Sequence, residues 1–226
     1  QADLASLANG GAGSLTVGCF SMFVRWPLAQ AILDFRETNP LVQISVDVGA
    51  HESLIEKLDN GAIDLLVSRN SRAWHGGAYR AVELMNDGIV LACSPAHPLA
   101  RRRATREDCV RFPWVSAPAG SIMRARLADE IRTAQLDVPH IVGALSLELG
   151  RELVMSGPYL WHLPGSVARN MAARNEIVIL PVTFKMDPGP LCAIWRRERS
   201  STRMSRSFML ALRAAVQVAR PHPDTA

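Results

Sequence analysis

The stretch LTVGCFSMFVRWPLAQAILDF, residues 15–35, begins like a buried strand and finishes like an amphipathic helix. Residues 14–18 form a short apolar run that is typical of a strand. Later in the stretch, apolar side chains recur at helical spacing, at Leu28, Ala31, Ile32 and Phe35. We therefore expect a strand that ends at Gly18 and a helix that begins near Ser21 or Met22.

The same order of strand and helix recurs along the chain. Further apolar or alternating runs predict strands at residues 41–48, 63–68, 88–93, 114–116, 141–144, 159–163, 177–182 and 191–195. Helical spacing predicts a helix that opens at residues 54–58 after a turn at 49–53, and helices at 105–110, 122–134, 148–155, 166–174 and 204–218. Strands that alternate with helices indicate an α/β fold with mainly parallel sheets and helices on both faces.

The pattern starts again near residue 88, which indicates two modules. If the last helix packs on the first module, the chain crosses between the modules twice, near residues 88–94 and 189–195. We expect a residual linker at 1–13, lobe I at 14–90 and 193–226, and lobe II at 91–192. The cleft between two such lobes is the natural place for a ligand.

The composition of the chain fits a folded protein with a sizeable core. Hydrophobic residues make up 48% and charged residues 20% of the 226 residues. No apolar run is long enough for a membrane span, and the start lacks the layout of a secretory signal, so we expect a soluble protein without a membrane partner. The four cysteines, Cys19, Cys93, Cys109 and Cys192, form no metal-binding spacing. A reducing cytoplasm fits this usage best.

The positive charge of the chain raises the question of nucleic-acid binding. The net charge is +4, and arginines cluster at residues 101–106 and 196–206. Neither cluster alternates with the aromatic residues on which single-stranded nucleic acids stack. Solvated surface is the favoured interpretation, and a nucleic-acid footprint the alternative.

Several stretches together resemble the effector-binding domain of LysR-type transcriptional regulators. The opening of that domain is similar to residues 13–69 of this chain, GSLTVGCFSMFVRWPLAQAILDFRETNPLVQISVDVGAHESLIEKLDNGAIDLLVSR. The shared features are a helix that ends in F-R-x-x-N-P and, after the next strand, the motif G-x-x-x-x-L-x-x-x-L-x-x-G-x-I-D-L. Further matches are VLACSPAHPLARR and LELGRELVMSGPYLWHLPGSVA, which takes the place of the family's L-x-x-V-x-x-G-x-G-I-x-x-L-P. The similarity covers residues 14 to about 218, and the order and distances of the motifs make it specific.

The resemblance implies a type-2 periplasmic-binding-protein fold, in which two Rossmann-like lobes are joined by two crossover strands. A small-molecule effector in the interlobe cleft would control DNA binding by an N-terminal winged helix-turn-helix that is absent here. Residues 1–13 resemble the end of the linker that follows such a module. Implied partners are a homodimer or homotetramer, DNA through the missing domain, and RNA polymerase in the full-length protein. The dimer would join the outer faces of residues 26–35 and 122–134.

In the first lobe, candidate effector-binding residues follow the predicted strands. Ser21, Met22 and Phe23 lie at the predicted helix start, where unpaired N–H groups and the helix dipole would favour a small carboxylate. The alternative is that Ser21 only caps its own helix. His51, Glu52 and Ser53 follow the second strand, and His51 falls where relatives often place a hydroxyl. The alternative for His51 is simple exposure. Arg69 follows the third strand and could bind an acid or pair with Glu52, the pairing being favoured.

In the second lobe, the candidates are small, acidic and aromatic residues. Ser116, Ala117 and Ser121 belong to a turn of small residues ahead of a helix, which offers further N–H donors, and Leu147 and Glu148 open the next helix. The last two candidates are Trp161 and His162, which stand where relatives carry small or aliphatic residues. Trp161 could form an aromatic wall for a ligand, but core packing is the commoner role of tryptophan in a strand.

Other classes of function find less support in the sequence. No motif of a nucleophile, phosphate loop, dinucleotide site or zinc protease occurs, so we expect neither an enzyme nor a cofactor or metal site. A secreted solute-binding protein with the same lobed fold is an alternative. A thiol-based redox sensor is a further alternative, since Cys19 lies next to the proposed anion site and some relatives sense peroxide.

Overall fold

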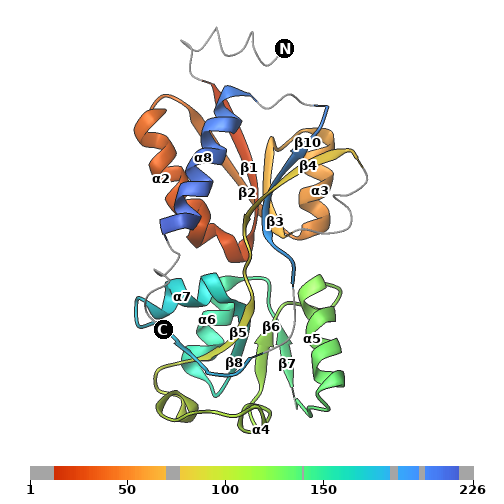
Figure 1. Ribbon diagram of the computed structural model, residues 1–226, viewed down its shortest axis with the longest axis vertical. Coiled ribbons are helices and arrows are strands. Elements are labelled where there is room, and N and C mark those ends of the chain that lie inside the picture. The colour runs from red at the N-terminus through yellow and green to blue at the C-terminus, as the bar shows by residue number, and fades with distance from the viewer. Residues whose placement is uncertain (1–12, 70–76, 139, 184–187, 199–201, 219–226) are drawn as a thin grey trace. The chain divides into compact units, whose positions relative to one another are not determined.

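The computed structural model describes residues 13–69, 77–138, 140–183, 188–198 and 202–218 (Figure 1). The chain divides into two compact units. Unit 1 consists of Gln1–Asn86 and Pro190–Ala226, and unit 2 of Asp87–Gly189. Each unit holds one five-stranded sheet with helices on both faces, so the predicted α/β class is confirmed.

The sheet of unit 1 has the strand order β2-β1-β3-β10-β4. Its strands are β1 (Ser14–Phe20), β2 (Gln43–Gly49), β3 (Leu65–Arg69), β4 (Tyr79–Met85) and β10 (Leu191–Arg196). Strand β1 runs parallel to β2 and β3, whereas β10 runs antiparallel to β3 and β4. The carboxyl ends of β2, β1 and β3 therefore meet at one edge of the sheet.

Helices cover both faces of this sheet (Figure 1). Helices α2 (Ala29–Thr38) and α8 (Arg203–Val218) pack together on one face, where the rings of Phe35 and Phe208 meet edge to face at 5.4 Å. Helix α3 (His51–Asn60) covers the other face. Leu54 and Leu58 of α3 pack there with residues that are also buried, namely Ile63, Leu66, Cys192 and Ile194.

The predicted helix start near Ser21 is wrong. Strand β1 continues to Phe20, and a 3-10 turn (η1, Ser21–Phe23) and a π-type turn (η2, Val24–Leu28) come before α2. Trp26 is extended, with φ −158° and ψ 135°. The cause is Pro27, because a proline disfavours helical geometry in the residue before it. Helix α2 can therefore begin only after Trp26.

Two further predictions in unit 1 need correction. The turn predicted at residues 49–53 is wrong, because α3 already begins at His51 and places Glu52 and Ser53 in its first turn. Strand β4 is not predicted from the sequence at all. It lies at the edge of the sheet and has only one buried residue, so it lacks the apolar alternation that marks a half-buried strand.

The sheet of unit 2 has the order β7-β6-β8-β5-β9. Its strands are β5 (Ile89–Cys93), β6 (Trp114–Ser116), β7 (Ile141–Gly143), β8 (Leu160–Pro164) and β9 (Val178–Ile179). Strand β6 is parallel to β7 and β8, and β5 is antiparallel to β8 and β9. Each of these strands overlaps a predicted one, and β6 has the predicted bounds.

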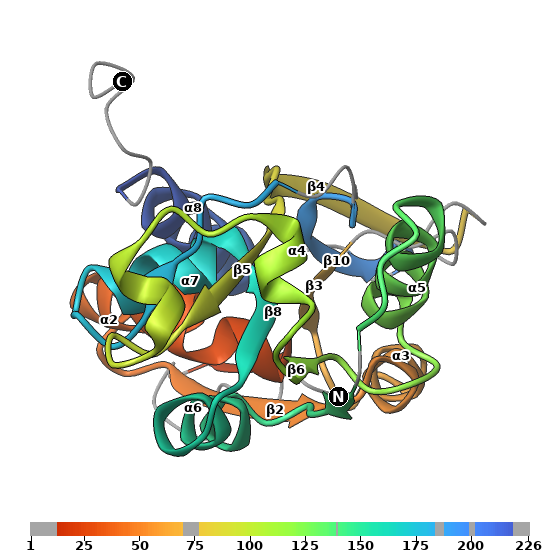
Figure 2. The ribbon, with the colours of Figure 1, turned by 90° about the horizontal axis from the view of Figure 1, so that it is seen from below.

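Helices also cover both faces of the second sheet (Figure 2). They are the 3-10 turn η4 (Pro98–Arg101), α4 (Arg106–Cys109), α5 (Ile122–Thr133), α6 (Leu147–Ser156) and α7 (Gly165–Ala172). On one face, the fully buried Trp114 packs with Leu127 of α5 and with strand residues such as Leu160. Helices α6 and α7 contact the sheet through β6, β8, β5 and β9.

Candidate functional site

Polar side chains gather where β1, β2 and β3 end in unit 1. Cys19 pairs with Val67 in the parallel register, and the two chains continue to Ser21 just after β1 and to Arg69 at the end of β3. His51, at the start of α3, lies with its Nδ1 3.5 Å from the Ser68 hydroxyl. We call Ser21, His51, Ser68 and Arg69 the first polar cluster.

Arg69 is the charged member of the first polar cluster. Only 9% of the residue is exposed, and its guanidinium carbon lies 5.6 Å from the centroid of the Phe23 ring. An aromatic face attracts a guanidinium and fixes its orientation. Phe23 is itself 1% exposed and Met22 9% exposed. Both predicted site residues thus lie in the core, where Phe23 supports Arg69.

The environment of His51 lowers its pKa. Burial is the larger cause, and the nearby carboxylate of Glu52 acts in the opposite direction. The imidazole is therefore neutral at pH 7 and can donate one hydrogen bond and accept another. Glu52 and Ser53 are exposed in the first turn of α3. Ser21 is not the cap of a long helix, since Phe20 takes the N-cap position of the short turn η1.

A second polar cluster lies in unit 2 and consists of Ser116 and His162. Because Val115 pairs with Trp161 in the parallel register, the residues that follow them, Ser116 and His162, are neighbours at the carboxyl end of β6. The Ser116 hydroxyl lies 3.0 Å from His162 Nδ1, and the residues are 1% and 2% exposed. The ring of Trp114 lies nearly parallel to the imidazole, at 14° and 6.5 Å between centroids.

Ser121, also predicted to bind a ligand, caps α5. Its hydroxyl donates to the Pro118 carbonyl at 2.8 Å and accepts from the Arg124 N–H at 3.1 Å. The local fold therefore uses both its donor and an acceptor site. Ala117 is half-buried in the turn before this cap.

Helix α6 likewise has its own cap. The Ser146 hydroxyl accepts from the Leu149 N–H at 3.1 Å and donates to the Glu148 carboxylate at 2.7 Å. This hydrogen bond is the main reason why the pKa of Glu148 is lowered. Leu147 is 7% exposed and packs in the core. The carboxylate that meets the start of α6 thus comes from the helix itself.

Trp161 packs against α6. A Cβ atom added to Gly150 of α6 would lie 2.4 Å from Cζ2 of the Trp161 indole. The tryptophan is 3% exposed, and the absence of a side chain at Gly150 makes room for it. Trp161 thus contributes to the core between β8 and α6.

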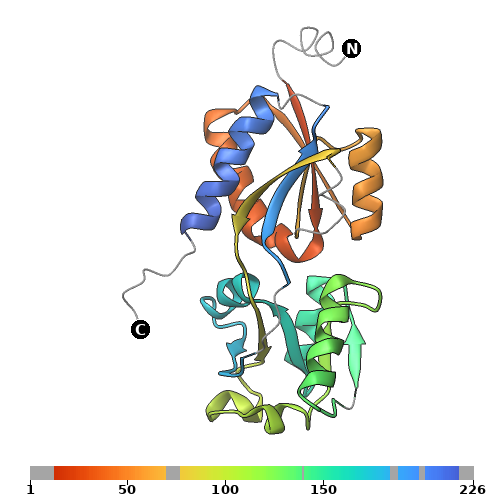
Figure 3. The same cartoon turned by 45° about the vertical axis from the view of Figure 1, so that its right-hand side comes forward.

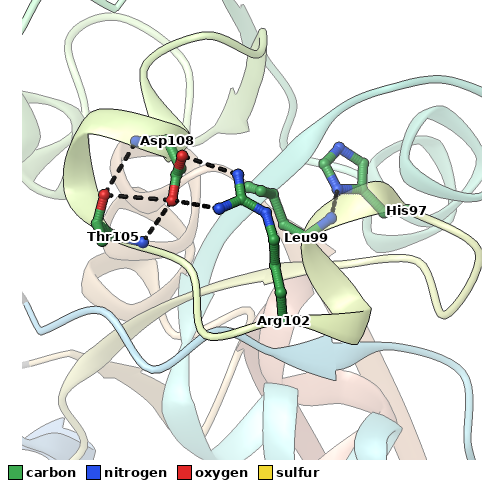
Figure 4. Close-up of polar contacts among 5 residues, drawn as sticks. All are labelled: His97, Leu99, Arg102, Thr105 and Asp108. Atoms are coloured by element: carbon green, nitrogen blue, oxygen red, sulfur yellow. Dashed lines mark hydrogen bonds and ion pairs between the residues drawn. The ribbon is translucent and has the colours of Figure 1, made fainter.

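The arginine run at residues 101–106 takes part in local structure (Figure 4). Arg102 donates to both carboxylate oxygens of Asp108, at 2.9 and 2.8 Å. Asp108 also accepts from the Thr105 N–H, which completes a capping box for α4. These donors hold the pKa of Asp108 at about 2, with Arg102 as the main cause. Arg106 pairs with Glu130 at 3.5 Å.

Two functional candidates escape the sequence reasoning. Ser68 is the last residue but one of β3, and the rule that ligands meet the carboxyl ends of parallel strands would have found it. Asp87 is 1% exposed, and its carboxylate accepts from the Ser166 N–H at 2.8 Å and from the Ser166 hydroxyl at 2.6 Å. It thereby caps α7 from the segment where unit 2 begins.

The described residues give no support for metal or thiol chemistry. They contain no group of three or more side chains that could hold a metal ion. The four cysteines are free and buried. Burial raises the pKa of Cys93 to about 12, raises those of Cys109 and Cys192 to about 11, and also raises that of Cys19. A reactive thiolate requires a lowered pKa, so a redox sensor is disfavoured.

Comparison with known proteins decides the family. The model of the LysR substrate binding domain matches residues 8–217. The chain belongs to this LysR family. Its fold is the type-2 periplasmic-binding-like fold of LysR regulatory domains. None of the helices in the described ranges has the length and apolar character needed to cross a bilayer.

Relatives of the LysR domain are named as transcriptional regulators. The HTH-type transcriptional regulator GbpR of Azospirillum brasilense is 22% identical over 94% of this chain and 63% of its own length. The uncharacterized HTH-type transcriptional regulator YdcI of Escherichia coli K12 is 22% identical over 69% of this chain and 51% of its own length. The chain thus spans between half and two thirds of these curated relatives.

Solved LysR structures have the same fold. The regulatory domain of MetR from N. meningitidis has a TM-score of 0.69 and 20% identity, with 92% of this chain and 95% of that chain covered. The cofactor-binding domain of the Cbl transcriptional regulator has a TM-score of 0.75 and 19% identity, covering 91% and 90%. The LysR family consists of regulators rather than enzymes, and it does not favour a secreted solute-binding protein.

Proposed function

We propose that this LysR domain senses a small molecule that bears a carboxylate, and that ligand binding controls a winged helix-turn-helix outside the present sequence. LysR-type regulators bind small-molecule effectors and form oligomers. The observation that supports a carboxylate-bearing ligand is the position of Arg69. Its guanidinium is nearly buried and lies on the Phe23 ring at the carboxyl end of β3. Arginine binds carboxylates through paired, charge-assisted hydrogen bonds.

The neighbours of Arg69 fit the same ligand. The first polar cluster adds the hydroxyls of Ser21 and Ser68 and the neutral imidazole of His51, and none of its members is a carboxylate. Hydroxyls and a neutral imidazole can orient a ligand without adding charge. An acidic ligand would therefore meet one positive charge and several adaptable donors.

The second polar cluster is proposed to contribute to ligand recognition as well. Ser116 and His162 offer a hydroxyl and an imidazole from unit 2. The expected position of the effector between the two lobes stays a prediction. In the full-length protein we also expect a cytoplasmic location, DNA binding through the N-terminal module, and RNA polymerase as a partner.

The proposal is tested by a thermal-shift screen of small carboxylates, sugars and aromatic acids, followed by calorimetric titration of the hits. A ligand that binds only the folded state raises its stability. Arg69→Met is expected to weaken an acidic hit at least tenfold, since a hydrogen bond to a charged group contributes about 1.5–3 kcal/mol. Ser21→Ala should cost about 1 kcal/mol or more for the same reason.

A matched control is Arg103→Met, because Arg103 is exposed in unit 2 and has no ion pair among the described residues. Ser68→Ala serves as a second site variant that leaves the charge of Arg69 in place. Binding of an acidic hit that survives Arg69→Met and Ser68→Ala unchanged contradicts the proposed site.

Exposed apolar residues suggest how the domain forms a dimer. In unit 1 they lie on α2, on β2 and between them, at Leu33, Leu41, Val46 and Val48. In unit 2 they gather at α6, at Leu145, Leu149 and Met155, whereas among the large exposed apolar residues α5 has only Ile122. We therefore propose that α6, rather than the predicted helix at 122–134, meets the α2–β2 surface of a second copy.

The dimer is tested by light scattering at tens of micromolar, roughly the dissociation constant of a weak interface. Leu149→Arg should yield monomer, while the control Ile122→Arg should leave the dimer intact. A monomeric unmodified domain, or equal loss of the dimer in both variants, is incompatible with the proposed surface.

A further inference from the structure

Unit 1 carries an apolar groove along α8, away from the first polar cluster. It is lined by Leu65, Trp195, Ser205, Arg206, Met209 and Leu210, and has a volume of about 300 Å³. We call it the α8 groove. Helix α8 also packs against β4, the edge strand of the sheet (Figure 3). Leu210 is 66% exposed, so a large apolar side chain stands in water beside the groove.

The packing of α8 does not need this surface. Phe208 and Leu212 of the same helix are fully buried on its inner side, and Phe208 contacts Phe35 of α2. Met209 and Leu210 project from a different side of the helix, because successive helical residues are about 100° apart. The apolar character of the groove is therefore not explained by the fold of unit 1.

Two arginines flank the groove. Arg206 lines it from α8, and Arg80 of β4 stands directly opposite Trp195 in the antiparallel pair with β10, so that both side chains project from the same face. Within the described part of the chain, neither guanidinium has an ion-pair partner. Both residues are exposed.

Among the described residues, the helix and strands beside the groove bring no acidic side chain onto its face, and Glu198, which follows β10, pairs with Arg196 at 2.8 Å. Helix α8 has three charged residues, Arg203, Arg206 and Arg213, and β10 has no acidic residue. In β4, Glu83 pairs with Cys192 and projects from the opposite face, since side chains alternate along a strand. An apolar floor between unpaired arginines selects a partner with an apolar side chain and flanking carboxylates.

We propose that the α8 groove docks an acidic amphipathic helix of a partner protein. A bulky apolar side chain of the partner fills the space between Trp195, Met209 and Leu210, and carboxylates one turn away on either side pair with Arg80 and Arg206. The volume is at the lower limit for a small-molecule pocket, which suits a single side chain better than a free ligand. A second copy of α8 is disfavoured because its arginines would repel those of the first.

The test uses the complete chain and a fluorescent 14-residue helical peptide with a central phenylalanine and glutamates one turn before and after it. Two matched peptides replace the glutamates by lysines or the phenylalanine by serine. Anisotropy titration should show binding of the acidic peptide only. Leu210→Ser should weaken this binding at least tenfold, and Arg206→Glu should weaken it while allowing the lysine peptide to bind.

The controls change equivalent residues elsewhere. Ile122→Ser on α5 removes an isoleucine that is 43% exposed, and Arg126→Glu inverts an exposed arginine of the same helix. Both should keep the affinity of the unmodified chain within twofold. The four substitutions are at exposed positions, and unchanged thermal unfolding confirms folding.

Three results would overturn the proposal. The first is equal binding of the acidic and the lysine peptides, and the second is loss of binding in the control variants as large as in Leu210→Ser. The third is displacement of the acidic peptide by a single-stranded oligonucleotide with higher affinity, which would assign the groove to nucleic acid. These outcomes do not depend on the effector, because the groove shares no residue with the first polar cluster.

Discussion

The guanidinium of Arg69 lies over the ring of Phe23, with 5.6 Å between its central carbon and the ring centroid. The pair joins the end of β3 to the turn that follows β1. Because Phe23 is 1% exposed and fixed in the core, the arginine has a rigid support. A charge held in this way loses little conformational entropy when it binds a ligand, which favours affinity.

Gly150→Ala should destabilise unit 2. The added Cβ would lie 2.4 Å from Trp161 Cζ2, and overpacking costs roughly 1–3 kcal/mol while the gain in helix propensity returns about 1 kcal/mol. A net loss of up to about 2 kcal/mol in the free energy of unfolding is expected from urea titration. The double variant Gly150→Ala/Trp161→Phe should recover part of it. Unchanged stability of the single variant would refute the close packing.

Asp87→Ala should destabilise the start of α7. The substitution removes the carboxylate that accepts two hydrogen bonds from Ser166. The buried N–H and hydroxyl of Ser166 then lose this acceptor. A loss of about 2–3 kcal/mol is expected, since such bonds involve a charged group. Asp87→Asn keeps an acceptor oxygen and should lose less. Equal unfolding midpoints for the two variants would show that the acceptor is unimportant.

His97 should make the domain less stable in acid. Its Nδ1 accepts from the Leu99 N–H at 3.1 Å, and burial is the main cause of its lowered pKa, partly offset by the Pro158 carbonyl. A lowered pKa means that the unfolded chain binds the proton first. The stabilisation is therefore complete above the unfolded pKa of about 6.5 and is lost as the pH falls towards the folded value.

His97→Asn keeps a side-chain acceptor for the Leu99 N–H but does not titrate. Urea midpoints at pH 7.5 and 5.5 should therefore differ less in the variant than in the unmodified chain. His51 also has a lowered pKa, but it is present in both proteins and cancels. An equal pH dependence of the two proteins would assign the effect to other groups.

The cysteines should be inert in the native domain. All four are buried, and burial raises their pKa values, so little thiolate is present at pH 8. Ellman's reagent should titrate no thiol in the native protein during the minutes in which it titrates all of them in urea. A native thiol that reacts at once, or that disappears after mild peroxide, would restore the redox alternative.

The elements that could be predicted from the sequence are those that are buried, because burial requires a pattern of apolar residues. Residues 114–116 are completely buried and were predicted with the observed bounds, and the last helix has an apolar face that packs on α2. The exposed edge strand β4 has no such pattern, so it escaped prediction. At Pro27 the rule for the residue before proline was available, and applying it to Trp26 would have moved the helix start to α2.

The candidate site was only partly predictable. The strand ends pointed to Ser21, His51 and Arg69, because the rule depends on topology alone. The stacking of Arg69 on Phe23 and the pair of Ser116 with His162 depend on register between distant strands. A single sequence does not reveal that register. The capping role of Ser121 depends on the local geometry of the Pro118 turn.

The place of β10 in the first sheet has a consequence for biosynthesis. This late strand lies between β3 and β4, and it is released from the ribosome after all of unit 2. Unit 2 is a single continuous segment and can acquire its structure while translation proceeds. The sheet of unit 1 stays incomplete between β3 and β4 until β10 is released, so these strand edges are exposed in the nascent chain while unit 2 is made.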